Sequence, residues 1–422
     1  MRATALIGII ILLVAPTYGK TDVYELGNSL TLAVEENPNS ETVAIRVRMY
    51  GKLEQIGLCS LLGHLMEDDN ELYSADEMTA IIEPTGGSFW AYGGNDYVTL
   101  YASVPAKDFS LALDILYNML ANPLLKNEDL QRERSFLLDK IVAEKDYPDS
   151  LLDNELNRVL FMDHPYKGKL IVDNLEEFKR ITVEDIKDFH SRYLKGGNVH
   201  VVVVGNIKRD KVLQLVSDSF GRIPEGIQKT EEYPVKPLTT EIRRRIKKRT
   251  TESQFCMAKK IQPLSPKEIN ILEVVNRILR GLGGRLGQEI REKRGYAYWV
   301  LVSGASSISK DGGYWAVYAG VKKKRFKEVE EIVLHQINRL IREPVSDEEL
   351  SRAKKKLITG ICMREHVNRS RAVYIHIRII RNRPIESTEN RIRNIESVSK
   401  EDIMALAKKL FSSDKYAILT LY

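Results

Sequence analysis

Residues 181–205, ITVEDIKDFHSRYLKGGNVHVVVVG, indicate the fold class. The chain ends on a second version of this stretch, SVSKEDIMALAKKLFSSDKYAILTLY, residues 397–422. Each version joins a helix pattern to an apolar, β-branched strand. Asp185 aligns with Asp402, an offset of 217 residues. Two copies of one α+β domain explain this repetition economically.

Other segments extend the duplication over much of each half. The helical stretch NEDLQRERSFLLDKI, from residue 127, matches SDEELSRAKKKLITGI, from residue 346. A Pro-, Gly- and Glu-rich segment between the copies is typical of a linker. We therefore predict two homologous α/β-sandwich domains, residues 20–222 and 238–422, joined by a linker over 223–237.

Local patterns in the first copy predict further elements. Residues 29–36 and 42–50 are apolar and β-branched around the turn-forming NPNS, which predicts a hairpin. Residues 86–104 read as strand, turn and strand. Ser74, with Glu77 three residues on, predicts the start of a helix. Helical patterns also cover 107–121, 127–145 and 183–193.

The composition is that of an ordinary globular protein. The chain has 422 residues, of which 43% are hydrophobic and 29% charged. These values exclude a disordered, collagenous or multi-span membrane protein. Cys59, Cys256 and Cys362 lie among apolar neighbours, so we expect buried, inert thiols.

Charge is distributed unevenly along the chain. Residues 1–220 carry a net charge of −12 and residues 221–422 one of +18, giving +6 overall. The basic residues lie in segments that also contain many Ile, Leu and Val, which favours solvated faces and attraction between domains. The densest basic run, RRRIKKR from Arg243 to Arg249, lacks interleaved aromatic residues, and a polyanion site there is the less favoured alternative. We predict no nucleic-acid partner.

The first 19 residues resemble a secretory signal peptide. One arginine precedes an unbroken apolar run from Ala3 to Ala15, and small residues follow up to Gly19. The run is short for a membrane span, which needs about 20 residues. We expect cleavage near Gly19 and export to the periplasm or the cell exterior, with an uncleaved anchor as the alternative.

Several segments together resemble the pitrilysin-type zinc peptidases, the family of mitochondrial processing peptidase and insulin-degrading enzyme, in its short form. They are GLCSLLGHLM, TGGSFWAY, LALDILYNMLANPLL and the VEDI to VVVVGNI segment in the first half, and GQEIREKRGYAY, GGYWAVYAG and SDEELSRAKKKL in the second. The resemblance implies that the two domains form a half-clamshell. A second half-clamshell, from the same or another chain, would close a chamber that holds a peptide.

The zinc motif implied by this resemblance is incomplete. Cleaving members carry His-x-x-Glu-His, in which two imidazoles bind zinc and the glutamate activates water. The corresponding residues here are Ser60, Leu61, Leu62, Gly63 and His64, so one ligand and the base are missing. The third ligand, a glutamate in active members, falls at or beside Lys140, and an ammonium group does not ligate zinc. We predict no metal and no cofactor in this chain.

Two neighbouring positions complete this comparison. Glu133 matches a supporting acid of the family, and Trp90 stands where active relatives usually have an asparagine. His64 with Glu67 or Asp68 would give too few ligands in fixed geometry for zinc.

The other half of the catalytic constellation is present. Family members place an arginine and a tyrosine seven residues apart in the second domain, and Arg291 and Tyr298 keep that spacing. The resemblance implies that this pair binds the substrate carbonyl and the developing oxyanion, where a fixed positive donor and a phenol lower the barrier. The plainer alternative is an Arg291 paired with Glu289 or Glu292 and a Tyr298 that packs its ring.

These features predict a peptidase subunit without its own zinc. It would supply Arg291 and Tyr298 to a zinc-bearing pitrilysin-like subunit in a heterodimer that hydrolyses peptides. The chain alone would then be inactive. The alternative function is that of a non-catalytic scaffold or peptide-binding protein with the same fold.

Overall fold

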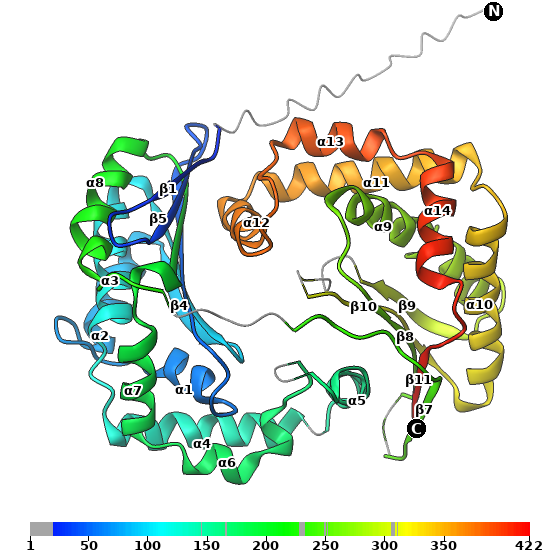
Figure 1. The fold of residues 1–422 in the computed structure, drawn as a ribbon, viewed down its shortest axis with the longest axis horizontal. Coiled ribbons are helices and arrows are strands. Elements are labelled where there is room, and N and C mark those ends of the chain that lie inside the picture. Colours follow the sequence, from blue (N-terminus) through cyan, green and yellow to red (C-terminus); the bar gives the residue numbers. More distant parts are fainter. Residues whose placement is uncertain are drawn as a thin grey trace, which may run out of the picture.

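The computed structural model describes residues 20–144, 146–164, 167–227, 233–248, 250, 252–304, 309 and 311–422. Two mixed β-sheets face each other, and most helices lie on their outer sides (Figure 1). The predicted signal peptide and the middle of the predicted linker lie outside the described residues.

Each half of the chain builds one sheet. The first has the order β1-β2-β6-β3-β5-β4, with β1 Asp22–Glu25, β2 Thr31–Glu36, β3 Thr42–Tyr50, β4 Ser88–Gly93, β5 Tyr97–Pro105 and β6 Val199–Gly205. The second has the order β7-β11-β8-β10-β9, with β7 Ile242–Ile246, β8 Gln254–Ile261, β9 Ala297–Ser303, β10 Gly313–Val321 and β11 Ala417–Leu421.

The two sheets have equivalent topologies. In each, the last strand of the half (β6 or β11) pairs parallel with the first strand of the repeat (β2 or β7) and antiparallel with the next one (β3 or β8). The remaining two strands follow in the same order, so the predicted internal duplication is confirmed.

The predicted hairpin of β2 and β3 is wrong. The strands form where expected, but β6 lies between them and pairs with both. The segment NPNS therefore joins two strands that are not neighbours. The predicted pairing of β4 with β5 is confirmed.

The helices include those that the sequence predicted, and some of them begin at a side-chain N-cap. In the first half they are α1 Leu58–Leu65, α2 Ala75–Ile82, α3 Phe109–Ala121, α4 Asn127–Glu144, α5 Pro148–Phe161, α6 Leu175–Arg180, α7 Val183–Tyr193 and α8 Arg209–Ser219. In the second half they are α9 Pro266–Leu279, α10 Phe326–Arg342, α11 Asp347–Glu365, α12 Asn368–Ile380, α13 Thr388–Glu396 and α14 Lys400–Phe411. Ser74 forms a capping box with Glu77. Asp185 and Asp402, the aligned residues of the repeat, close equivalent boxes on α7 and α14.

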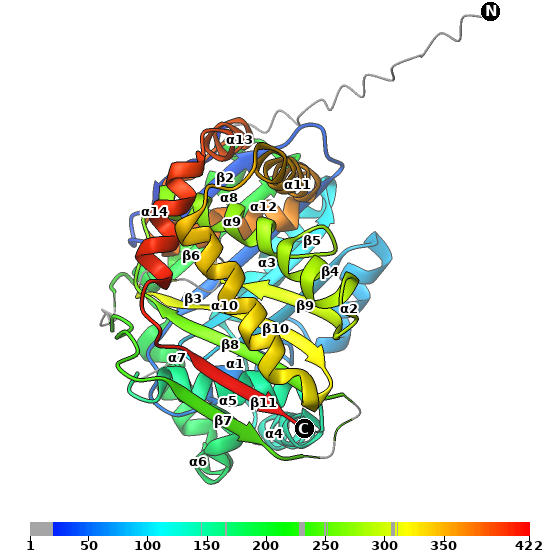
Figure 2. The same ribbon diagram turned by 90° about the vertical axis from the view of Figure 1, so that its right-hand side faces the viewer.

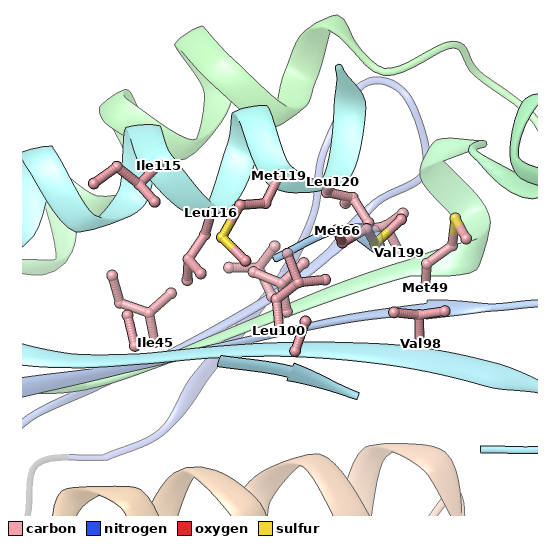
Figure 3. Close-up of a cluster of buried hydrophobic side chains, with 14 of the residues drawn as sticks. Ile45, Met49, Met66, Val98, Leu100, Ile115, Leu116, Met119, Leu120 and Val199 are labelled. Atoms are coloured by element: carbon pink, nitrogen blue, oxygen red, sulfur yellow. The ribbon is translucent and has the colours of Figure 1, made fainter. Parts of the chain in front are cut away.

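The main hydrophobic cores lie between each sheet and its outer helices. In the first half, Ile45 and Leu100 from the sheet pack under Leu116 and Met119 of α3 (Figure 3). In the second half, α10 and α14 cross the outer face of the sheet (Figure 2). The three cysteines are buried and unpaired, as predicted.

The two halves exchange helices. Helix α5 of the first half packs on the inner face of the second sheet, where Leu152 and Leu156 join Ala258 and Leu419. Helix α12 of the second half packs on the inner face of the first sheet, where Ala372 and Ile375 contact Val202 (Figure 1). Each inner face is thus partly covered by the other half of the chain.

A buried ion pair fixes α12 to the first sheet. The Arg371 guanidinium donates to both carboxylate oxygens of Glu35 at 2.7 and 2.8 Å, and the two residues are 2% and 0% exposed. Glu365 lies 3.2 Å from the same guanidinium. Removing one partner of such a pair strongly destabilises the folded protein, because the other charge stays buried and uncompensated.

No helix in the described part of the chain is long and apolar enough to cross a membrane.

Candidate functional site

The positions of the incomplete zinc motif lie where α1 packs against the edge strand β4. Helix α1 carries Ser60, Gly63 and His64, and its apolar residues face the first sheet. Gly63 is buried, and His64 is half-buried at the end of the helix. The helix therefore presents one imidazole.

Gly63 allows a close approach between the helix and the strand. A Cβ atom at position 63 would lie 2.4 Å from the amide nitrogen of Gly93 and 2.5 Å from the carbonyl carbon of Tyr92. A Cβ atom at Gly93 would in turn meet the backbone of Cys59 at 1.7 Å. Backbone atoms cannot rotate away as a side-chain end can, so this packing leaves no room for the missing glutamate.

His64 is held by helix α4. Its Nδ1 atom lies 3.3 Å from a carboxylate oxygen of Glu133, and its ring packs edge-on against Phe136. Burial lowers the pKa of His64 and the Lys140 ammonium lowers it further, whereas Glu133 opposes both. Glu133 is thus a partner of His64, and Lys140 is close enough for its positive charge to act on the imidazole.

The carboxylates next to His64 are engaged elsewhere. Glu67 accepts a hydrogen bond from the backbone N–H of Ala91 in β4, and Asp68 pairs with Arg132. Burial raises the pKa of Glu67, and it raises that of Asp68 to about 6. Across the described ranges, no group of three His, Cys, Asp or Glu side chains could hold a metal ion.

Arg291 and Tyr298 lie side by side on the second sheet. Arg291 belongs to a π-helix, Gly287–Glu292, and Tyr298 to the edge strand β9. The guanidinium carbon lies 5.6 Å from the centre of the tyrosine ring, and the ring is 78% exposed. π-Helices are rare and frequently occur at functional sites.

The pair retains hydrogen-bonding capacity. Arg291 approaches Glu292 at 3.5 Å, while Glu289 is paired with Lys293 and Arg294. Within the described residues, the Tyr298 hydroxyl has no hydrogen-bond partner, so its ring is not held by a polar anchor. The two donors can therefore reach a carbonyl oxygen or an oxyanion beside the sheet edge.

Family comparisons match both halves. Residues 31–174 match "Insulinase (Peptidase family M16)", and residues 180–357 match "Peptidase M16 inactive domain". The chain belongs to peptidase family M16. This confirms the family inferred from the sequence.

Individual relatives and solved structures are also similar to this M16 chain over most of its length. An "Uncharacterized zinc protease" of Rickettsia felis is 25% identical over 93% of this chain and 95% of its own length. The β subunit of the mitochondrial-processing peptidase of Saccharomyces cerevisiae is 24% identical over 92% and 88%. The crystal structure of a peptidase M16 inactive domain from Pseudomonas fluorescens superimposes with a TM-score of 0.86 and 17% identity, over 95% of this chain and 97% of that one. A Helicobacter pylori protease gives 0.85 and 16%, over 96% and 99%. The predicted fold class is confirmed.

Zinc does not fit the corresponding position of this M16 chain. Ser60 replaces one ligand, the backbone of β4 fills the space next to Gly63, and Lys140 carries the wrong charge. His64 with its partner Glu133 offers two ligands, fewer than the three protein ligands of catalytic zinc sites.

Three of the described bases in the run from Arg243 contact carboxylates within the chain. Arg243 forms a bidentate pair with Glu330, and Lys248 contacts Asp146 at 2.9 Å. Arg244 lies 3.7 Å from Glu155 of α5, which comes from the first half. The structure thus favours the expected attraction between the halves over a polyanion site.

Sequence reasoning missed two arginines on the inner face of the first sheet. Arg46 and Arg48 alternate along β3 between apolar residues. Residues at i and i+2 of a strand point to the same face, so the pattern IRVRMY already indicated two neighbouring cations on one side of the sheet.

Proposed function

We propose that this M16 chain is the zinc-free subunit of an exported, heterodimeric peptidase, in which Arg291 and Tyr298 assist a site on a zinc-bearing partner. One contrast supports the proposal. The metal position is closed by backbone packing and by Lys140, whereas Arg291 and Tyr298 lie together, exposed, on an edge strand.

The chain's own contribution is positioning and charge stabilisation. The Arg291 guanidinium is permanently charged and donates through a planar fork, and the Tyr298 hydroxyl adds a second donor. Directed at a peptide carbonyl, these groups hold the substrate and stabilise the negative charge that grows on its oxygen during attack. The attacking water and the metal that activates it belong to the partner subunit.

Substitution of the pair in the assembled heterodimer tests the proposal. Arg291→Ala or Tyr298→Phe should lower the turnover of peptide by about 10²–10³, the usual cost of losing one oxyanion donor. Arg291→Lys should also be poor, because lysine lacks the planar fork. Assembly, followed by size-exclusion chromatography, should be unchanged.

Two neighbouring substitutions serve as matched controls. Arg294 is an exposed arginine paired with Glu289, and Tyr296 packs its ring beside Arg325 at 4.4 Å. Arg294→Ala and Tyr296→Phe should keep turnover within about threefold of the wild type, since neither residue has a place in the proposed chemistry. Full turnover in the Arg291 and Tyr298 variants would instead favour a scaffold or peptide-binding protein.

A further inference from the structure

The inner face of the first sheet combines arginines with aromatic rings. It is formed by Arg46, Arg48, Trp90, Tyr92, Tyr97 and Tyr101, which we call the arginine–aromatic surface. The residues that alternate with the arginines along β3, such as Ile45 and Met49, point into the core under α3 (Figure 3). The arginine–aromatic surface therefore faces the second half of the chain.

The two arginines share one neutral acceptor. Arg46 Nη2 donates to the Tyr92 hydroxyl at 3.0 Å, and Arg48 Nη2 approaches the same oxygen at 3.3 Å. Arg48 Nε also donates to Thr99 at 2.8 Å. Arg46 is only 6% exposed, and its buried Nε has no partner. Among the described residues, neither guanidinium forms an ion pair with a carboxylate.

This arrangement is costly for a purely structural role. A buried charge is normally paired, because removing it from water without a partner is strongly unfavourable. Burial lowers the pKa of Arg46, and Arg48 lowers it further. Arg48 stacks over Tyr97 at 3.8 Å, but a cation–π contact supplies no acceptor for the remaining N–H groups.

More positive charge surrounds this surface. Arg369, an exposed residue of α12, lies 5.0 Å from the ring centres of Trp90 and Tyr101. A cavity of about 580 Å³ adjoins Arg48 and takes its lining from both halves of the chain. Among the described residues, its charged side chains are the bases Arg48, Lys52, Lys167 and Arg381 and the acids Asp96 and Asp311. Arg48 and Tyr97 are the residues of the arginine–aromatic surface that line it.

Arg48 and Lys167 form no ion pair with a carboxylate among the described residues. Burial raises the pKa of the Asp96 carboxyl, and the positive charge of Arg48 opposes that rise. Lys167 donates to Ser309 and to the carbonyl of Gly312, both neutral acceptors in the second half. An anionic group in the cavity would therefore meet two cations, Arg48 and Lys167, that no described carboxylate pairs with.

We propose that the arginine–aromatic surface and its cavity bind a carboxylate of the peptide substrate, so that the preferred substrates are acidic peptides. A carboxylate in the cavity would give the Arg48 guanidinium an anionic acceptor, and the rings would pack on the flanking peptide. The carboxylate can be an Asp or Glu side chain or the peptide C-terminus. The proposal rests on the proposed function, which brings a peptide to this face.

Four variants of one peptide distinguish the two sources of the carboxylate. Two carry Glu and two carry Gln at the central positions, and one of each two ends in a free acid and the other in an amide. Each carries a neutral N-terminal dye. Fluorescence anisotropy measures their binding to the purified chain. Either the change of Glu to Gln or that of acid to amide should weaken binding at least tenfold at low salt, and the difference should shrink as salt is raised.

Substitution then assigns the preference to the surface. Arg48 is only half-buried, so Arg48→Gln should fold, as checked by its melting temperature, and should abolish the preference for the carboxylate. Arg180→Gln removes the same charge from the exposed end of the outer helix α6 and should preserve the preference for the carboxylate (Figure 1). Equal affinities of the wild type for all four peptides would overturn the proposal. So would a preference that persists in Arg48→Gln.

The two proposals fail separately. If the Arg291 and Tyr298 variants lose turnover while the wild type ignores the carboxylate, the peptidase function stands and the acidic preference is wrong. If acidic peptides bind selectively but the same variants keep full turnover, the chain binds peptides without assisting their cleavage.

Discussion

Gly63→Ala tests whether backbone packing has closed the former metal position. The added Cβ atom would stand 2.4 Å from Gly93 N and 2.5 Å from the carbonyl carbon of Tyr92, far inside van der Waals contact. Overpacking of a core costs about 1–3 kcal/mol, and the upper end applies because the obstacle is backbone. For a domain of about 200 residues, a loss of about 3 kcal/mol lowers the melting temperature by roughly 6–12 °C.

Gly27→Ala is the matched control for this substitution. A Cβ atom at Gly27 meets no heavy atom within 4 Å, so the same chemical change should leave stability within about 0.5 kcal/mol. Thermal unfolding followed by circular dichroism compares the two variants with the wild type. Equal melting temperatures for all three proteins would refute the argument.

Restoration of the zinc motif extends the same test. Ser60→His with Gly63→Glu should bind no zinc, because the glutamate has no space and Lys140 keeps its positive charge beside the site. Adding Lys140→Glu should still fail, since the steric obstacle remains. A triple variant that melts like the wild type and holds about one zinc per chain would show that α1 can move away from β4.

Four further measurements address the metal, the helix exchange, the pH response and assembly. Metal analysis of the purified chain should find no stoichiometric zinc, and about one tightly bound zinc per chain would contradict the site geometry. Glu35→Gln should cost about 3–5 kcal/mol in urea unfolding because it leaves Arg371 buried without its main partner, whereas the exposed Arg352→Gln should cost less than about 0.5. Burial, assisted by Arg48, lowers the pKa of His200 from 6.5 to about 4, so only the unfolded chain takes up this proton between those values. The free energy of unfolding should therefore fall as pH drops from 6.5 towards 4, and His200→Gln should flatten that slope; an unchanged slope would remove His200 from the acid response. Higher salt should slow assembly with the partner more than it weakens the finished complex, and equal association rates at low and high salt would exclude electrostatic steering.

Local sequence patterns predicted the elements well but not their neighbours. The capping box predicted at Ser74 and Glu77 involves residues three positions apart, so the sequence reveals it directly. The boxes closed by Asp185 and Asp402 have the same spacing but were not predicted. The insertion of β6 between β2 and β3 joins strands separated by most of a domain, and no pattern within either strand specifies that partner.

The same distinction, between contacts of sequence neighbours and contacts of distant segments, applies to the candidate sites. The sequence spacing singled out Arg291 and Tyr298, and the structure brings them together through the turn that lies between them. Their catalytic role stays a prediction. The obstacle at Gly63 was not predictable from the motif, since it arises from Gly93, a residue of another element. The arginine–aromatic surface was missed because the lack of an ion-pair partner for Arg46 and Arg48 among the described residues emerges only from the assembled sheet.

The exchange of α5 and α12 has a consequence for synthesis of the chain on the ribosome. The first sheet is complete once β6 has emerged at Gly205, yet the helix that covers part of its inner face begins only at Asn368. Until then, Ala33, Ala44 and Val202 remain exposed on a nascent domain that cannot bury Glu35 against Arg371. The first half therefore completes its folding only after the second half has been synthesised. A chain stopped at the linker would expose apolar and charged residues of the first sheet to chaperones and proteases.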